Sequence, residues 1–342
     1  YRMQKHKVIL EILRKNLLQG FFIFIIVCVF FEISYRNSVI DFYNAEIKGL
    51  NSKKVLEKTN IDFLVFGDSF SATAPDINYI DKLRRAYPNV SFLNVSIPGI
   101  GIRQVNTFAK SKINKYQPKA IIYQIYVGND LTDVDHLWDL KKFSIARNLY
   151  WEASDYFLSL SYLNHKSTVF SPRINSRTYT MATDIFSEDY YNQRTKRFLK
   201  FDQSYFNNTI MLKEPFKIRY DAWLHHIKVF LDTVPVDIPV YLIWVPHCSQ
   251  LNDYYVNNLK ELGANFNDKK TIQQNGYPFF ETAKEDLSAY RNVVQLNPLE
   301  RFKLKDNLGC RLYFANDPHI NNNGNEVLSQ FLEKNLPLLK IN

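Results

Sequence analysis

Two mostly apolar runs constrain the fold of this 342-residue chain more than any other feature: Ile61 to Phe66 and Ala120 to Val127. Near-continuous apolar runs of this length are typical of strands that are buried on both faces of a parallel sheet. Further strand-like runs alternate with helical patterns along the chain. The strand-like runs are Ser91 to Ile97, Pro239 to Val245 and Asn292 to Leu296, and the helical patterns are Ile77 to Tyr87, Gln104 to Tyr116 and Asn325 to Leu336. The sequence therefore predicts an α/β fold, a three-layer α/β/α sandwich around a parallel sheet.

Three short polar blocks lie where this fold would bring them together. Gly67-Asp68-Ser69 ends the first run, Gly128-Asn129-Asp130 ends the second, and Asp317-Pro318-His319 precedes the final helix. Taken singly, each block reads as a turn, a cap or a surface loop. In parallel sheets, however, sites form beyond the carboxyl ends of the strands. We therefore expect the three blocks to form one site.

The residue types in these blocks suit acyl transfer by a serine. Ser69 would be the nucleophile, with His319 as the base that removes its proton and Asp317 holding the imidazole. A tetrahedral intermediate needs aimed donors. The candidates are the backbone N–H groups of Ser69 and Gly99 and the side-chain amide of Asn129. Gly99 follows a strand, and a residue without Cβ lets the backbone approach a substrate.

On these residues the chain resembles the SGNH, or GDSL-type, hydrolase superfamily. The blocks that carry the resemblance are Phe66 to Ser69, Asn94 to Gly99, Val127 to Asp130, and Asp317 with His319, Asn321 and Gly324. The resemblance covers residues 61–136 and 236–338. It implies a flavodoxin-like SGNH fold in which Ser69, Asp317 and His319 form a catalytic triad. Gly99 and Asn129 would complete the oxyanion hole.

Two positions depart from the common family pattern. Val127 stands where many members have glycine, and the acid and base are spaced D-x-H, with Asn316 at the usual acid position. The D-x-H form resembles the membrane-associated branch that handles acyl groups on polysaccharides. Around the site, Asp68 is expected to cap the helix after Ser69 or to bond within the site. Gly128 and Asp130 are expected to organise their loop.

The N-terminus reads as a membrane anchor. A basic tail precedes the uncharged apolar run Leu17 to Phe31, which Glu32 to Tyr35 can extend, with Glu32 reaching to the membrane interface. A cleaved signal peptide would need small residues at its cleavage site, which this sequence lacks. A buried core helix would not explain the basic tail. We therefore expect residues 1–35 to be a single-pass inner-membrane anchor with a cytoplasmic N-terminus and a periplasmic catalytic domain.

The remaining boundaries follow from composition. Residues 36–60 are expected to be a juxtamembrane linker, and residues 61–342 the catalytic domain, with a mainly helical insertion at about 137–235. The insertion is rich in aromatic residues and could be a glycan platform, an ordinary packed helical insertion, or a docking surface for a membrane partner. Its aromatic residues include Trp138, Tyr150, Trp151, Tyr156, Tyr162, Tyr190, Tyr191, Tyr205 and Trp223.

Cysteines and histidines outside the triad give weaker signals. Cys248 and Cys310 fall near the same sheet edge and could pair in an oxidising periplasm or stay free. His225 and His226 are expected on a helix surface. His247 ends a strand and could contact substrate or simply occupy a loop. No metal-ligand spacing, glycine-rich phosphate loop or nucleic-acid-binding stripe is present, so the sequence predicts no metal, cofactor or nucleic-acid partner.

The expected function is a serine esterase or O-acyltransferase that acts on O-acyl groups, particularly O-acetyl groups, of an extracytoplasmic glycan. Hydrolysis and transfer use the same residues, and the anchor favours transfer with a membrane acyl-donor protein. A lipid esterase or thioesterase is the rival enzyme. A third alternative is a non-catalytic SGNH-like subunit of an envelope complex. The distance from Ser69 to His319 separates a working site from a scaffold.

Overall fold

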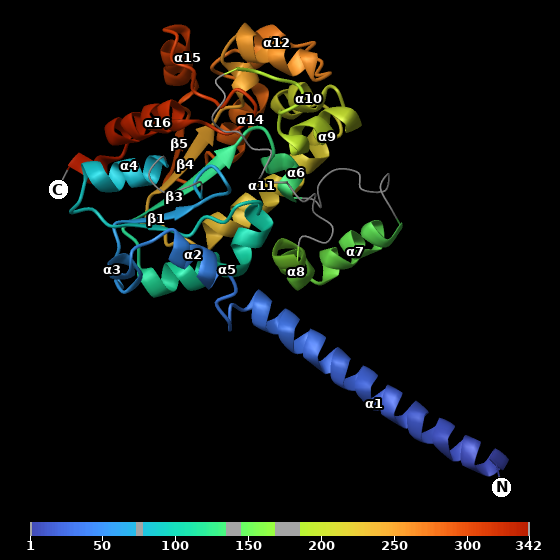
Figure 1. The fold of residues 1–342 in the computed structure, drawn as a ribbon. Coiled ribbons are helices and arrows are strands. Elements are labelled where there is room, and N and C mark those ends of the chain that lie inside the picture. Colours follow the sequence, from blue (N-terminus) through green and yellow to red (C-terminus); the bar gives the residue numbers. More distant parts are fainter. Residues whose placement is uncertain (1, 73–77, 135–144, 168–184, 341–342) are drawn as a thin grey trace.

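The computed structural model describes residues 2–72, 78–134, 145–167 and 185–340. Its centre is a parallel sheet with the strand order β2-β1-β3-β4-β5 (Figure 1). This order is that of flavodoxin-like sheets, so the predicted fold class is confirmed. The strands are β1 Phe63–Phe66, β2 Phe92–Asn94, β3 Ala120–Tyr126, β4 Val240–Val245 and β5 Val293–Leu296.

Helices cover both faces of the sheet. The helices α5 and α11 pack against each other on one face, and α4 and α16 pack together on the other (Figure 1). The described helices are α1 Arg2–Arg36, α2 Asn44–Gly49, α3 Lys53–Leu56, α4 Tyr79–Ala86, α5 Ile102–Tyr116, α6 Asp130–Val134, α7 Ile145–Tyr156, α8 Ser159–Ser167, α9 Gln193–Phe201, α10 Tyr205–Met211, α11 Phe216–Asp232, η3 Cys248–Gln250, α12 Asp253–Glu261, α13 Lys269–Ile272, α14 Pro278–Asp286, α15 Leu299–Asn307, α16 Asn322–Asn335 and η4 Pro337–Lys340.

Local sequence explains where the principal elements begin and end. Every residue of β1, β3 and β4 is buried, as their apolar runs require. The side chain of Asn78 caps α4 by accepting from the N–H of Ile80 at 2.8 Å. The helix α5 ends at Gln117, which adopts a left-handed conformation with a φ of 42° just before Pro118. These elements match the predicted ones to within a few residues.

The long interval between β3 and β4 is helical, as predicted, but its last helix belongs to the sandwich. Trp223 and Phe230 of α11 are fully buried. The ring of Phe230 lies 5.3 Å from that of Phe66, and the ring of Trp223 lies 5.8 Å from that of Trp244. Because α11 covers the sheet, it is the crossover helix from β3 to β4, and the insertion proper ends before Phe216.

Most described aromatic residues of the insertion are packed rather than displayed. Tyr191 and Tyr205 are buried, and Tyr150 and Tyr162 are partly buried against the core. Tyr156 and Tyr190 are largely exposed. Trp138 lies outside the described residues, as does the side chain of Trp151. The packed-insertion reading therefore fits the described part better than a continuous glycan platform.

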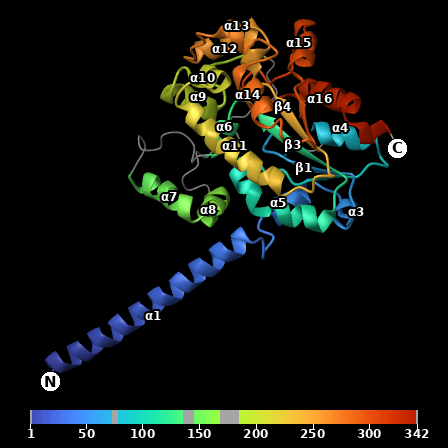
Figure 2. The same ribbon diagram turned by 180° about the vertical axis from the view of Figure 1, so that it is seen from behind.

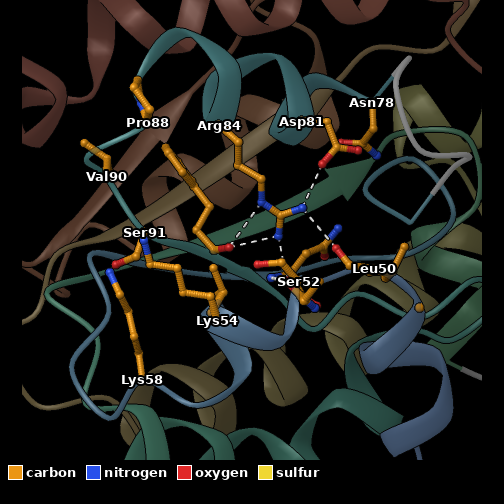
Figure 3. Close-up of a pocket in the computed structure, with 15 residues that line it drawn as sticks. Leu50, Ser52, Lys54, Lys58, Asn78, Asp81, Arg84, Pro88, Val90 and Ser91 are labelled. Atoms are coloured by element: carbon orange, nitrogen blue, oxygen red, sulfur yellow. Dashed lines mark hydrogen bonds and ion pairs between the residues drawn. The ribbon is translucent and has the colours of Figure 1, made fainter.

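The segment expected to be a linker, residues 36–60, packs onto the domain. Asn51 mimics a neighbouring strand at the sheet edge, because its amide donates to the carbonyl of Asn94 at 2.7 Å and accepts from the N–H of the same residue at 2.8 Å. Figure 3 shows Arg84 at the centre of this contact. Its guanidinium donates to the carbonyls of Leu50 at 3.0 Å and Phe92 at 2.8 Å, beside a pocket of about 470 Å³.

Arg84→Met should lower the free energy of unfolding by about 2–3 kcal/mol, because several hydrogen bonds from a charged donor are lost together. Chemical unfolding of the detergent-solubilised chain measures this. Arg85→Met, at an exposed position of the same helix, is the matched control and should stay within about 0.5 kcal/mol of the wild type. Equal effects of the two substitutions would contradict the proposed role of Arg84.

The first helix is long and stands away from the domain. Its segment Leu10–Arg36 is long and apolar enough to cross a membrane. In both views α1 projects from the domain, with α7 and α8 beside the end at which it joins (Figures 1 and 2). The expected anchor is compatible with this finding.

Candidate active site

The three polar blocks meet at the carboxyl edge of the sheet. Gly67 to Ser69 directly follow β1, and Gly128 and Asn129 follow β3. The third block, Asp317 to His319, lies in the loop before α16. That loop is held in place by backbone hydrogen bonds such as the one from Phe314 N to His319 O. The site therefore forms because neighbouring parallel strands end at the same level and the last loop folds over them.

Ser69, His319 and Asp317 form a connected chain of hydrogen bonds. Ser69 Oγ lies 2.8 Å from His319 Nε2. Asp317 Oδ1 accepts from His319 Nδ1 and also from the backbone N–H of His319 at 2.8 Å. A proton held on Nδ1 by the carboxylate leaves Nε2 free to accept the proton of Ser69. The structure thus gives the predicted triad the connectivity that a serine nucleophile needs.

The turn that presents Ser69 requires a glycine. A Cβ on Gly67 would lie 2.7 Å from Gln124 Oε1, a buried side chain of β3. That same oxygen accepts from the N–H of Asp68 at 3.2 Å and from the hydroxyl of Ser71 at 3.1 Å. Through these two hydrogen bonds, Gln124 of β3 holds the turn that carries Ser69 in place.

The predicted oxyanion-hole residues line the same pocket as Ser69. The backbone N–H groups of Ser69 and Gly99 have no hydrogen-bond partner among the described residues. Gly99 has a φ of +76°, which favours glycine, and a Cβ there would meet nothing within 4 Å. The Asn129 amide donates one N–H to Asp133 at 2.7 Å, which orients the amide and leaves its second N–H for a substrate.

Asp68 and Asp130 are buried supports of these loops. Asp68 Oδ1 accepts from the N–H of Phe70 at 2.9 Å, so it bonds within the site rather than with the solvent. Burial raises the pKa of the Asp68 carboxyl. Burial also raises the pKa of Asp130 well above its usual range, and the charge of Asp68 adds to this. Neither carboxyl contacts the nucleophile directly.

Asn192 was not predicted from the sequence, yet its side chain bonds to Asp317, the predicted acid of the triad. Its side-chain amide donates to Asp317 Oδ2 at 2.7 Å, and its carbonyl oxygen caps α9 by accepting from the N–H of Arg194 at 2.9 Å. The neighbouring residue Asn316 accepts from the N–H of Ser187 at 2.7 Å. The insertion is therefore fastened to the catalytic loop at two adjacent residues.

Arg194 adds a second link from the insertion to the site. Its guanidinium donates to Asp133 Oδ1 at 2.7 Å, and the other oxygen of Asp133 accepts from Asn129. Burial raises the pKa of Asp133 to about 6, although the charge of Arg194 opposes this rise. Arg194 also lines the pocket beside Ser69. No sequence pattern indicates the contact between Arg194 and Asp133, because the two residues are 61 positions apart.

The pocket in front of Ser69 has a volume of about 270 Å³ and a mixed lining. Aromatic rings form much of its wall, and the ring of His319 stacks on that of Phe70 at 4.6 Å. The residues that line it are Ser69, Phe70, Pro98, Gly99, Tyr126, Gly128, Asn129, Asn192, Arg194, Thr195, Phe198, Phe206, Pro318 and His319. The size suits a short acyl group near the nucleophile better than a long chain.

The cysteine and histidine predictions have different outcomes. Cys248 and Cys310 are free in the structure, which is the second of the two alternatives; Cys248 is buried within η3, whereas Cys310 lies half-exposed in the loop after α15. His247 is fully buried, bonds to Ser249 Oγ at 2.8 Å and does not line the pocket. Burial lowers the pKa of His247 to about 3. No group of potential metal ligands occurs within the described ranges.

This chain is similar in overall structure to several solved proteins. No protein-family model matches the sequence, and no curated protein is significantly similar to it. A catalytic mutant of an acetylxylan esterase from Geobacillus stearothermophilus is similar over 82% of this chain and 95% of its own, with 12% identity and a TM-score of 0.42. A protein described as a GDSL-like lipase from Parabacteroides merdae is similar over 81% and 97%, with 12% identity and a TM-score of 0.40.

Asn192→Ala should lower kcat for an ester substrate by about 10- to 100-fold, because a hydrogen bond to a charged group contributes about 1.5–3 kcal/mol. Steady-state kinetics measure the loss. Gln193→Ala changes the exposed neighbouring side chain and should leave kcat unchanged. A normal kcat in Asn192→Ala would show that Asp317 needs no support from the insertion.

The pH profile should report the pair formed by Asp317 and His319. Burial lowers the pKa of His319, but the charge and hydrogen bond of Asp317 outweigh it, so the net pKa lies above its ordinary value. Because only neutral imidazole can act as the base, kcat/KM should rise with pH through this pKa. Asp317→Asn removes the raising charge and should shift the acidic limb to lower pH, with a plateau about 10⁴-fold lower. Asp130→Asn is the isosteric control, and a limb that stays in place in Asp317→Asn would contradict the pairing.

Proposed function

We propose that this chain is a membrane-anchored SGNH-type serine enzyme that cleaves or transfers short O-acyl groups, particularly O-acetyl groups of an extracytoplasmic glycan. The observation that carries the proposal is the hydrogen-bonded series from Ser69 through His319 to Asp317. Free backbone donors beside Ser69 add support. A scaffold subunit would have no need of this geometry.

The residues define the steps of the reaction. Ser69 Oγ attacks the ester carbonyl while His319 Nε2 takes its proton. The N–H groups of Ser69 and Gly99 and the amide of Asn129 stabilise the negative oxygen of the tetrahedral intermediate. His319 then returns the proton to the leaving sugar oxygen, which leaves an acyl group on Ser69. Water or a second sugar hydroxyl attacks this acyl-enzyme while His319 accepts its proton. The bond between the acyl carbon and Ser69 Oγ then breaks, and His319 returns the proton to Oγ.

The pocket favours a short acyl group over a lipid chain. Its volume of about 270 Å³ lies below the 300–1,000 Å³ of typical small-molecule pockets. Its polar residues, Asn129, Asn192 and Arg194 among them, suit a hydroxylated or charged substrate more than an acyl tail. A lipid esterase would need a longer apolar groove. Hydrolysis and transfer remain two outcomes of one acyl-enzyme.

The anchor supports a location at the membrane. The basic residues before the apolar run favour a cytoplasmic N-terminus, so the catalytic domain would face the periplasm. There it would meet envelope or secreted glycans. If the reaction is transfer, a membrane protein that supplies acyl groups would be its partner.

Incubation of the detergent-solubilised chain with p-nitrophenyl acetate should place an acetyl group on Ser69, detected by mass spectrometry of the peptide. Ser69→Ala is the control and should carry none. If the adduct clears in water, the enzyme is an esterase; if it persists until a sugar acceptor is added, it is a transferase. An unmodified Ser69 together with no turnover would favour the non-catalytic alternative.

A further inference from the structure

The anchor helix enters the domain without a flexible joint. Glu32, near the end of the apolar stretch, is buried, and its carboxylate accepts from the N–H groups of Leu158 and Ser159, each at 2.9 Å, at the start of α8. Arg36 donates to Glu32 and to the carbonyl of Tyr156. The carboxylate of Glu32, which was expected at the membrane interface, thus caps the start of α8.

Aromatic packing makes the same joint rigid. The ring of Phe31 lies 5.3 Å from that of Phe42 and 6.3 Å from that of Tyr162 on α8. Tyr35 is buried and bonds to the hydroxyl of Tyr43 at 2.9 Å. The last turns of α1 therefore belong to the core of the domain while the preceding turns are exposed. Any membrane that holds α1 also fixes the orientation of the domain.

The end of the apolar run brings the domain close to the bilayer. Leu17 to Phe31 has no charged residue, and the segment that is long and apolar enough to cross a membrane continues to Arg36. The residues at the end of this segment then lie at the boundary of the bilayer. Because those residues are already buried in the domain, the domain surface around the end of α1 must lie at the same depth.

That surface carries exposed apolar side chains. We call it the junction patch and define it as the exposed apolar residues at positions 39–40 and 145–163, which include helices α7 and α8 and the turn between them. Ile145 is 80% exposed, Leu149 60% and Tyr156 77%. The remaining members are Val39, Ile40, Phe157 and Leu163. In both views α7 and α8 lie on the side of the domain from which α1 emerges (Figures 1 and 2).

We propose that the junction patch lies in the headgroup layer of the bilayer that α1 crosses. A run of exposed apolar side chains on a soluble surface marks an interaction site. Here the rigid joint at the end of the candidate span places the lipid against it, as in interfacial helices. The patch then makes α7 and α8 a second membrane contact and holds the catalytic domain directly on the membrane. This inference depends on the membrane anchor of the proposed function but not on its chemistry.

Lipid-borne quenchers can test the contact in the full chain reconstituted into phosphatidylcholine vesicles. In a Cys28→Ser, Cys310→Ser background, a bimane label is placed at Leu149→Cys or Tyr156→Cys. The matched control is Leu308→Cys, at an exposed leucine just after α15, at the end of the domain away from α1 (Figure 1). Phe24→Cys within α1 is the positive control, measured with lipid that carries its spin label deep in the acyl chain.

Lipid carrying a spin label near the headgroup should quench the labels at positions 149 and 156 about twofold or more, because interfacial side chains lie about 5–10 Å into the headgroup boundary. The label at position 308 should be unaffected. Quenching at position 24 without quenching at 149 and 156 would overturn the proposal and leave the anchor intact. Absence of quenching at position 24 would overturn both. Ester hydrolysis in the same vesicles reports the proposed chemistry separately.

Discussion

The hydrogen bond between Ser69 and His319 joins residues that are 250 positions apart, and most of the fold contributes to it. Ser69 is placed by a strand buried on both faces and by Gln124 beneath its turn. His319 is placed by the loop that precedes α16, and Asp317 sets its tautomer. The sheet fixes one partner and the final loop fixes the other, so the contact forms only when the whole sandwich has closed.

The insertion supports the site through hydrogen bonds that its amino-acid composition did not indicate. Asn192 joins α9 to Asp317, and Arg194 joins the same helix to Asp133 and through it to Asn129. The first residues of one short helix therefore orient both Asp317 and, through Asp133, Asn129. Thr195 and Phe198 of this helix also line the pocket, so the insertion forms part of the pocket wall.

Sequence predicted the strands, the sheet class and the site residues because those signals are local. An apolar run marks a buried strand, and a polar block at its end marks the sheet edge. The contact between Asn192 and Asp317 spans 125 positions and depends on how the insertion folds, so no spacing indicates it. The sequence left the pairing of the cysteines open for the same reason: proximity to one sheet edge does not set the geometry a disulfide requires. The capping role of Glu32 was not predicted either, because its partners Leu158 and Ser159 are equally distant in sequence.

The burial of Tyr35 and Ser34 has a consequence for how this protein is made. These residues end α1, the helix that is long and apolar enough to cross a membrane, yet they are part of the core of the domain. A chain cut at residue 37 would lose the cap of α8 and uncover the rings of Phe42 and Tyr162. The core of the domain is therefore complete only when the end of α1 is packed into it, so α1 is a structural part of the domain as well as a candidate anchor.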